Sequence, residues 1–262
     1  MRYFDSHAHY YDERFTDECA EGVEALLQGL LSDKVSYIVN VGTDPTTSRA
    51  AIAQAVKHTG MYTAIGIHPS DTRFLSDIDK ELADIVGLIR DPASKCVCLG
   101  EIGLDYHYPD TDKEKQLLYF ERQMTLAEEL DIPVCIHDRE AHSDVMEVIR
   151  HHPKVRGILH SFSGSREMAE ELVELGYYIS FSGTLTFTNA RKPKEVAATI
   201  PKDRVLIETD CPYLAPHPLR GTLNHSGNLE YTCRALAAIW GVSEEECAAV
   251  TENNAKRIFG LA

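Results

Sequence analysis

Histidine and carboxylate side chains of the kind that bind metal ions recur along the chain where short apolar runs stop. His7 and His9 lie two positions apart in the segment FDSHAH, and side chains at positions i and i+2 of an extended segment point to the same side. A single histidine at such a place is more often a hydrogen-bonded residue of the core. Burying six or seven of these groups together without a cation would cost several kcal/mol. We therefore expect a metal site bound by His7, His9, Glu101, His137, His160 and Asp210, with His68 beside it.

Four histidines and two carboxylates are more ligands than one ion with an open position needs, so they suit two ions. Two metal ions ~3.5 to 4 Å apart can bridge a water molecule, activate it as hydroxide and hold both the attacking and the leaving oxygen. Glu101, on a middle strand, is the expected bridge between the ions. We expect one ion to be bound by His7, His9, Glu101 and Asp210, and the other by Glu101, His137 and His160.

Two of these ligands, Glu101 and Asp210, are the expected catalytic residues. Rather than binding a metal ion, Asp210 could act as a general base for the metal-activated water. His68 could donate a hydrogen bond to a ligand or contact the substrate. Imidazole and carboxylate ligands fit zinc, manganese, iron or nickel, whereas magnesium prefers oxygen ligands. The expected cofactors are two divalent metal ions, with Mg, Mn and Zn left open, and the ligands support hydrolysis of an ester, amide or phosphodiester bond.

Eight short apolar runs, each a candidate strand, alternate with amphipathic stretches such as 114–130 and 165–176, which have helical spacing. No linker-like tract divides residues 1–262, so we expect a single domain. This alternation of strands and helices predicts an α/β fold, a (β/α)8 TIM barrel. Two helical patterns follow the last strand, so we expect an extra C-terminal helix. A doubly wound open sheet is the alternative. The candidate strands begin near Arg2, Val35, Met61, Lys95, Ile132, Val155, Tyr177 and Arg204.

The composition limits the partners of the chain. A formal net charge of −15, from 41 acidic and 26 basic residues, repels polyanions at long range, so a phosphate substrate has to be captured locally. The seven cysteines lack CxxC spacing and are expected to be reduced core thiols. The N-terminus shows no signal peptide and no stretch approaches 18 apolar residues. We expect a cytoplasmic protein without membrane contact, and a monomer.

The motifs resemble those of the TatD family of metal-dependent deoxyribonucleases, within the amidohydrolase-like barrels. The resemblance runs from end to end, with several long motifs in the family's order, which is far more specific than an isolated HxH pair. The motifs are FDSHAH, GIHP at 66–69, GEIGLDY at 100–106, IPVCIHDREAH at 132–142, LHSFSGS at 159–165, YYISFSGTLTF at 177–187, ETDCPYLAP at 208–216 and the closing NNAKRIFGL.

The resemblance implies a TIM barrel with a divalent-metal centre that hydrolyses phosphodiester bonds, typically by 3′ to 5′ trimming of DNA ends. It implies metal ligation by the six matching residues named above and phosphate contact by Arg139. A salt bridge at the barrel rim is the alternative for Arg139. Ser161 and Ser163 could also hydrogen-bond a phosphate, although serines that form a turn are the commoner explanation. His68 and Arg220 complete the expected substrate contacts.

One loop departs from the family pattern. HPLRGTLNHSG at 217–227 keeps Arg220, Gly221 and Asn224, but has Thr222 and Leu223 where the family usually has Lys-Arg. Each lost phosphate contact weakens binding of a polyanion. The leading expectation is a nuclease acting on DNA ends or another phosphodiester. The alternative is an ester or amide hydrolase for a small molecule or aminoacyl-tRNA, and a third hypothesis, a binding protein without activity, conflicts with the complete ligand set.

Overall fold

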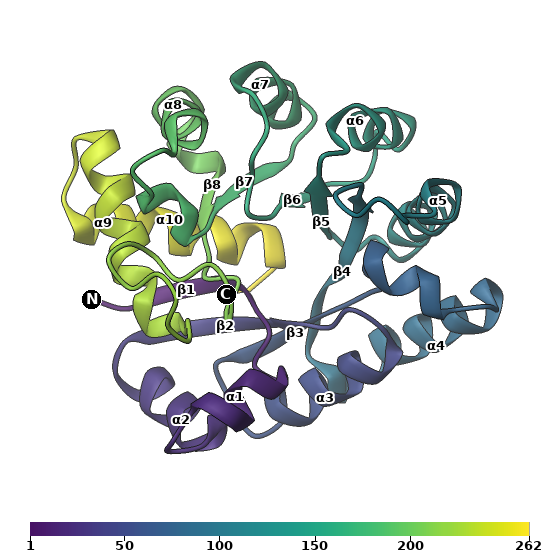
Figure 1. The fold of residues 1–262 in the computed structure, drawn as a ribbon, viewed down its shortest axis with the longest axis horizontal. Coiled ribbons are helices and arrows are strands. Elements are labelled where there is room, and N and C mark those ends of the chain that lie inside the picture. Colours follow the sequence, from purple (N-terminus) through teal and green to yellow (C-terminus); the bar gives the residue numbers. More distant parts are fainter. Residues whose placement is uncertain (262) are drawn as a thin grey trace.

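Eight parallel strands form a barrel that is surrounded by helices in the computed structural model, which describes residues 1–261 (Figure 1). The strands pair in chain order from β1 to β8. Between β1 and the segment after β8, the carbonyl of His7 accepts a hydrogen bond from the Asp210 N–H at 2.9 Å, and His9 N–H donates to the Cys211 carbonyl at 2.8 Å. The strands are β1 (Tyr3–Ala8), β2 (Val35–Val41), β3 (Met61–Ile65), β4 (Cys96–Asp105), β5 (Val134–Arg139), β6 (Gly157–Leu159), β7 (Tyr178–Phe181) and β8 (Val205–Ile207).

The helices confirm the (β/α)8 TIM barrel and its extra C-terminal helix, since α9 and α10 both follow β8. Every strand begins within two residues of its expected start. None of the helices in residues 1–261 has both the length and the apolar character needed to cross a membrane. The helices are α1 (Glu13–Glu18), α2 (Val23–Asp33), α3 (Pro45–Ala55), α4 (Ile78–Arg90), α5 (Lys113–Leu130), α6 (His142–His151), α7 (Arg166–Glu174), α8 (Arg191–Thr199), α9 (Leu229–Trp240) and α10 (Glu244–Phe259).

The last helix, α10, closes the end of the barrel where the strands begin. Ser243 caps its first turn by accepting from the Glu246 N–H, and Gly260 ends it with a left-handed backbone. Its apolar residues join the inward-facing side chains of the strands in one core cluster, in which the rings of Phe4 and Phe259 stack with centroids 5.7 Å apart. The opposite end of the barrel, where the strands stop, is left for polar side chains.

Strand β4 is longer than expected. Glu101 was expected at the end of the strand, but β4 continues to Asp105 and pairs with β5 as far as Arg139. A shift in the pairing between Leu99 and Ile102 interrupts the regular alternation beside Glu101. At Gly103, with φ of +133°, a Cβ atom would lie 2.1 Å from the His137 carbonyl oxygen. Only glycine allows the two strands to approach this closely.

Replacing Phe259 with alanine should test the contribution of α10 to stability. The side chain is 6% exposed, and deleting a core phenylalanine ring costs about 3–5 kcal/mol of the free energy of unfolding. Urea unfolding followed by circular dichroism measures the change. Leu118→Ala on α5, where the leucine is 50% exposed, is the control and should change the value by less than about 0.5 kcal/mol. Equal effects of the two substitutions would contradict the packing of α10.

Candidate metal centre

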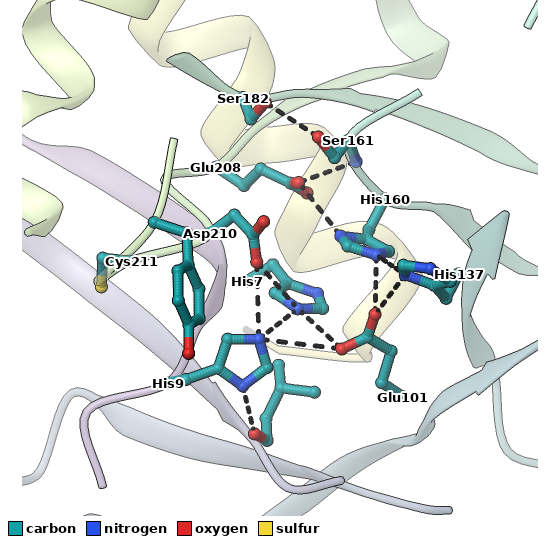
Figure 2. A network of polar contacts seen from close by, with 12 residues as sticks. His7, His9, Glu101, His137, His160, Ser161, Ser182, Glu208, Asp210 and Cys211 are labelled. Atoms are coloured by element: carbon teal, nitrogen blue, oxygen red, sulfur yellow. Dashed lines mark hydrogen bonds and ion pairs between the residues drawn. The ribbon is translucent and has the colours of Figure 1, made fainter. Parts of the chain in front are cut away.

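The structure brings the six predicted ligands together at the end of the barrel where the strands stop (Figure 2). They are spread from residue 7 to residue 210 of the chain and meet because the strand ends of a closed barrel form one ring. His7 lies in β1, Glu101 in β4 and His137 in β5. The other three, His9, His160 and Asp210, follow strands β1, β6 and β8.

One group of ligand atoms lies around the imidazoles of His7 and His9, whose Nε2 atoms are 3.0 Å apart. Glu101 Oε2 lies 3.3 Å from the first of these nitrogens and 3.7 Å from the second. Asp210 Oδ1 lies 3.7 Å and 3.4 Å from the same two atoms. Ligands of a tetrahedral zinc ion, bound at about 2.0–2.1 Å, are about 3.3 Å from each other. The four atoms therefore have spacings that suit a single ion.

The second group lies around the other carboxylate oxygen of Glu101. Oε1 is 2.8 Å from His137 Nδ1 and 2.8 Å from His160 Nε2, and these two nitrogens are 3.1 Å apart. The two groups of ligand atoms are in contact with each other, since the rings of His7 and His160 stack with centroids 4.1 Å apart. Each oxygen of the Glu101 carboxylate thus faces its own pair of histidines, which is the arrangement expected of a bridging ligand.

The outer nitrogens of three histidines show which nitrogen can bind an ion. His9 Nδ1 lies 2.8 Å from the Val41 carbonyl oxygen, and His137 Nε2 lies 3.2 Å from Asp105 Oδ2. His160 Nδ1 lies 3.4 Å from Glu208 Oε1. An acceptor at the outer nitrogen keeps the proton there and leaves the inner nitrogen with a free lone pair, as in most metal-bound histidines. The donor set therefore fits divalent ions.

His68 differs from these histidines. Its Nδ1 accepts a hydrogen bond from the Ser70 N–H at 3.1 Å, so a neutral ring carries its proton on Nε2, which lies 3.5 Å from Glu101 Oε1. Burial lowers the pKa of His68 to about 3, which keeps the ring neutral. This arrangement supports the role of a donor to Glu101 over that of a metal ligand.

The charges within the group are strongly coupled. Burial raises the pKa of Glu101, but the surrounding imidazoles, first His160, outweigh it and hold this pKa well below its usual range. Burial lowers the pKa of His160, and the carboxylates of Glu101 and Glu208 reverse this and raise it well above its usual range. His7 has a lowered pKa because of burial and the charge of His160. In the absence of ions the group therefore holds a proton on His160, which a metal ion must displace.

The segment after β8 is anchored so that Asp210 points into the group. The buried carboxylate of Asp5 accepts hydrogen bonds from the Thr209 N–H at 2.9 Å and from its hydroxyl at 2.6 Å. Asn224, also fully buried, donates from Nδ2 to the carbonyls of Thr209 at 3.0 Å and Tyr213 at 2.7 Å. Asp210 itself has a left-handed backbone, with φ of +56°.

A cavity of about 870 Å³ opens above the ligands. Of the expected substrate contacts, His68, Arg139 and Ser163 line it. Arg139 is 45% exposed and lies 3.9 Å from Asp105. Arg220 lies further out, with its guanidinium 4.5 Å from the ring centroid of Phe187, which does line the cavity.

Sequence reasoning missed the buried carboxylates behind the ligands: Asp5, Asp105 and Glu208. All three lie inside motifs that contain a ligand, two residues before His7, four after Glu101 and two before Asp210. Their closeness in sequence to the ligands was the signal that could have identified them. Glu208 Oε1 lies 3.4 Å from His160 Nδ1 and accepts from the Ser161 N–H at 2.7 Å, whereas its buried Oε2 has no hydrogen-bond partner within residues 1–261.

Comparison with known proteins places the chain among metal-dependent hydrolases. A family model described as TatD related DNase matches residues 4–260. The chain is similar to the metal-dependent hydrolase YabD of Bacillus subtilis, with 40% identity over 98% of this chain and 99% of the relative. It is 33% identical to the metal-dependent hydrolase TatD of Mycobacterium tuberculosis over 98% and 97% of the two chains. The solved structure of the TatD homologue YjjV from Escherichia coli superposes with a TM-score of 0.91, at 29% identity, and covers 100% of this chain and 99% of that one.

Glu101→Gln should reduce the number of bound ions. Glutamine keeps the size of the side chain but removes the charge and one acceptor oxygen, so it cannot bridge two ions. We expect about two ions per chain in the unaltered protein and about one or fewer in the variant. Elemental analysis after dialysis without chelator measures this number. Glu128→Gln on the surface of α5 is the control, and an unchanged number in Glu101→Gln would contradict the bridging role.

Metal binding should weaken as the pH falls. The raised pKa of His160 means that this imidazole is protonated below that pKa, and the proton must leave before Nε2 can bind an ion. The apparent affinity should fall up to about tenfold for each pH unit below the pKa. Calorimetry of Zn²⁺ binding near neutral pH, in buffers of different ionisation enthalpy, should show release of about one proton. Binding without proton release, and with a pH-independent affinity, would contradict the assignment.

Proposed function

The chain belongs to the TatD-related DNase family and is a metal-dependent hydrolase, and we propose that it is a deoxyribonuclease that cleaves phosphodiester bonds at DNA ends in the 3′ to 5′ direction. We propose two divalent ions as its cofactors, with Mg, Mn and Zn as the candidates. The reaction is metal-assisted hydrolysis: water adds to phosphorus, the P–O bond that joins the terminal nucleotide to the strand breaks, and the departing oxygen takes up a proton.

The observation that carries the proposal is the position of Glu101. Its two carboxylate oxygens are divided between two pairs of imidazoles, with His7 and His9 on the Oε2 side and His137 and His160 on the Oε1 side. A single-ion hydrolase has no need for this duplication. When bound, two neighbouring divalent ions activate a water molecule and stabilise the charge that develops on the phosphate oxygens.

Asp210 has the position and the charge of a proton acceptor in this reaction. Burial raises its pKa, but a hydrogen bond from His9 and the charges of His160 and His7 lower it below the usual value. The side chain is 15% exposed, which is more than the 4% of Glu101. Asp210 is therefore ionised at neutral pH and open toward the cavity, where it can take a proton from the attacking water.

The phosphate is proposed to contact Arg139 and Ser163, which line the cavity beside His137 and His160. Arg139 can hold two phosphate oxygens at once through its planar guanidinium. These local contacts are needed because the net charge of −15 repels a polyanion.

An ester or amide substrate is the second candidate, and the loop after β8 motivates it. Thr222 and Leu223 carry no charge, and Leu223 packs against a core cluster that contains Tyr10 and Phe15. A small neutral molecule or an aminoacyl-tRNA would require fewer phosphate contacts than a DNA strand does.

Substrate assays separate the two candidates. The protein, purified without chelator and supplied in turn with Mn²⁺, Mg²⁺ and Zn²⁺, is tested on 3′-labelled and 5′-labelled single-stranded DNA, p-nitrophenyl esters and aminoacyl-tRNA. We expect loss of 3′ nucleotides, and a reduction of at least about 100-fold in Glu101→Ala, because transition-state stabilisation by metal is lost. Cleavage of an ester with intact DNA would replace the nuclease by the second candidate.

A further inference from the structure

The mouth of the cavity carries two aromatic rings, each accompanied by an arginine, on the side of β4 to β8. Tyr108, in the loop after β4, and Phe187, after β7, both line the cavity. The Arg139 guanidinium lies 5.7 Å from the ring centroid of Tyr108, and the Arg220 guanidinium lies 4.5 Å from that of Phe187. Tyr108 is 49% exposed, so its ring is a large apolar surface in contact with solvent. The metal chemistry proposed above uses neither ring.

The cations on this side are available to a ligand. Arg220 has no carboxylate within 4.0 Å among residues 1–261, and the same holds for Lys192, which lies between the cavity-lining residues Ala190 and Pro193 at the start of α8. Arg139 is paired only loosely, at 3.9 Å, with Asp105. In a chain with a net charge of −15, these charges form a local basic patch at the mouth of the cavity. Salt screens the distant acidic groups beyond about 8 Å, so such a patch can act locally.

The other side of the mouth is different. Asp12 lines the cavity after β1, and Asp71 lies near both Asp44 and Thr43, another lining residue. Arg73 is the cation near Asp71, and Arg14 is the cation near Asp12. Asp105 and Asp138 line the cavity on the β4–β5 side, but they lie 3.2 Å from His137 and 2.7 Å from His142. The cations on that side can therefore attract a phosphate chain. The two sides of the cavity mouth therefore differ in charge.

We infer that Tyr108, Arg139, Phe187, Lys192 and Arg220 form a rim that binds the unpaired end of a nucleic-acid strand. Phe187 and Tyr108 stack on the bases, and the three cations contact the phosphates between them. Aromatic platforms combined with a basic track are the way in which proteins hold single strands without reading their sequence. The inference rests on the proposed function, because it places the strand that the metal centre cleaves. It assigns the preference for a nucleic-acid strand over a small phosphodiester to residues that bind no metal ion.

The test compares two phosphodiesters. Bis(p-nitrophenyl) phosphate reaches the metal centre without extending along the rim, whereas a short oligothymidylate covers both. In Phe187→Leu and Tyr108→Leu we expect KM for the oligonucleotide to rise roughly 5- to 100-fold, the loss typical of one stacked base. The value of kcat/KM for the small diester should stay within about twofold, which also shows that the fold and the metal centre are intact.

Arg220→Ser tests the phosphate contact separately. The slope of log KM for the oligonucleotide against log salt concentration should decrease in magnitude by about 0.7, the value for one lost contact to a single strand. Arg234→Ser is the matched control, since Arg234 also lies over an aromatic ring, that of Tyr231 at 5.8 Å, but on the outer helix α9. This control should change neither the slope nor KM.

The outcomes distinguish the rim from the proposed function. If the unaltered protein cleaves neither phosphodiester with any of the three metals, the nuclease function fails and the rim with it. If the unaltered protein cleaves both, and the rim variants leave KM for the oligonucleotide unchanged, the rim alone is overturned. An equal loss on both substrates would assign the rings to the fold of the mouth and would also overturn it.

Discussion

The structure depends on the placement of one buried carboxylate among imidazoles. Glu101 is 3% exposed, and a charge in that position is unstable unless cations compensate it. Four histidines from three separate parts of the chain surround it. Despite burial, the pKa values of His160, His9 and His137 are raised by the nearby carboxylates, so that without metal ions a proton held among these rings compensates the charge. Metal ions can replace that proton without moving the ligands, because the nitrogen and oxygen atoms already have separations typical of a coordination shell. The barrel serves to hold these groups at such separations.

The support for this arrangement comes from a layer of acids behind the histidines. Asp105 and Glu208 face the outer nitrogens of His137 and His160, and Asp5 holds the segment that carries Asp210. The negative charges of Asp105 and Glu208 fix the orientation of these two rings and raise their basicity toward a metal ion. Much of the acidic excess of the chain lies elsewhere on its surface, but these acids are buried where they act. The rim at the cavity mouth supplies the opposite charge, at the place where a phosphate strand would enter.

The sequence was sufficient for the architecture and for the six inner groups. Apolar runs of strand length placed every strand start within two residues, because burial on both faces makes the strands of a parallel barrel continuous apolar segments. Histidines after such runs converge by topology alone. The sequence could not predict that β4 continues past Glu101, since this depends on close contact of Gly103 with the backbone of β5. It also could not predict that Arg220 would lie over Phe187, a contact between side chains 33 positions apart. Such pairings depend on three-dimensional packing and leave no periodic signal.

The position of α10 has a consequence for biosynthesis. This helix packs against β1 and β8 and fills the base of the barrel with residues 244–259. A nascent chain emerges from the ribosome with β1 first, and that strand must wait for the final helix before its apolar side chains, such as Phe4, are covered. Contacts between the ends of a chain are slow to form, because a large loop has to close. Until α10 has left the ribosome, the incomplete barrel exposes apolar surface and unpaired strand edges, which are the features that make a partly folded chain prone to aggregation.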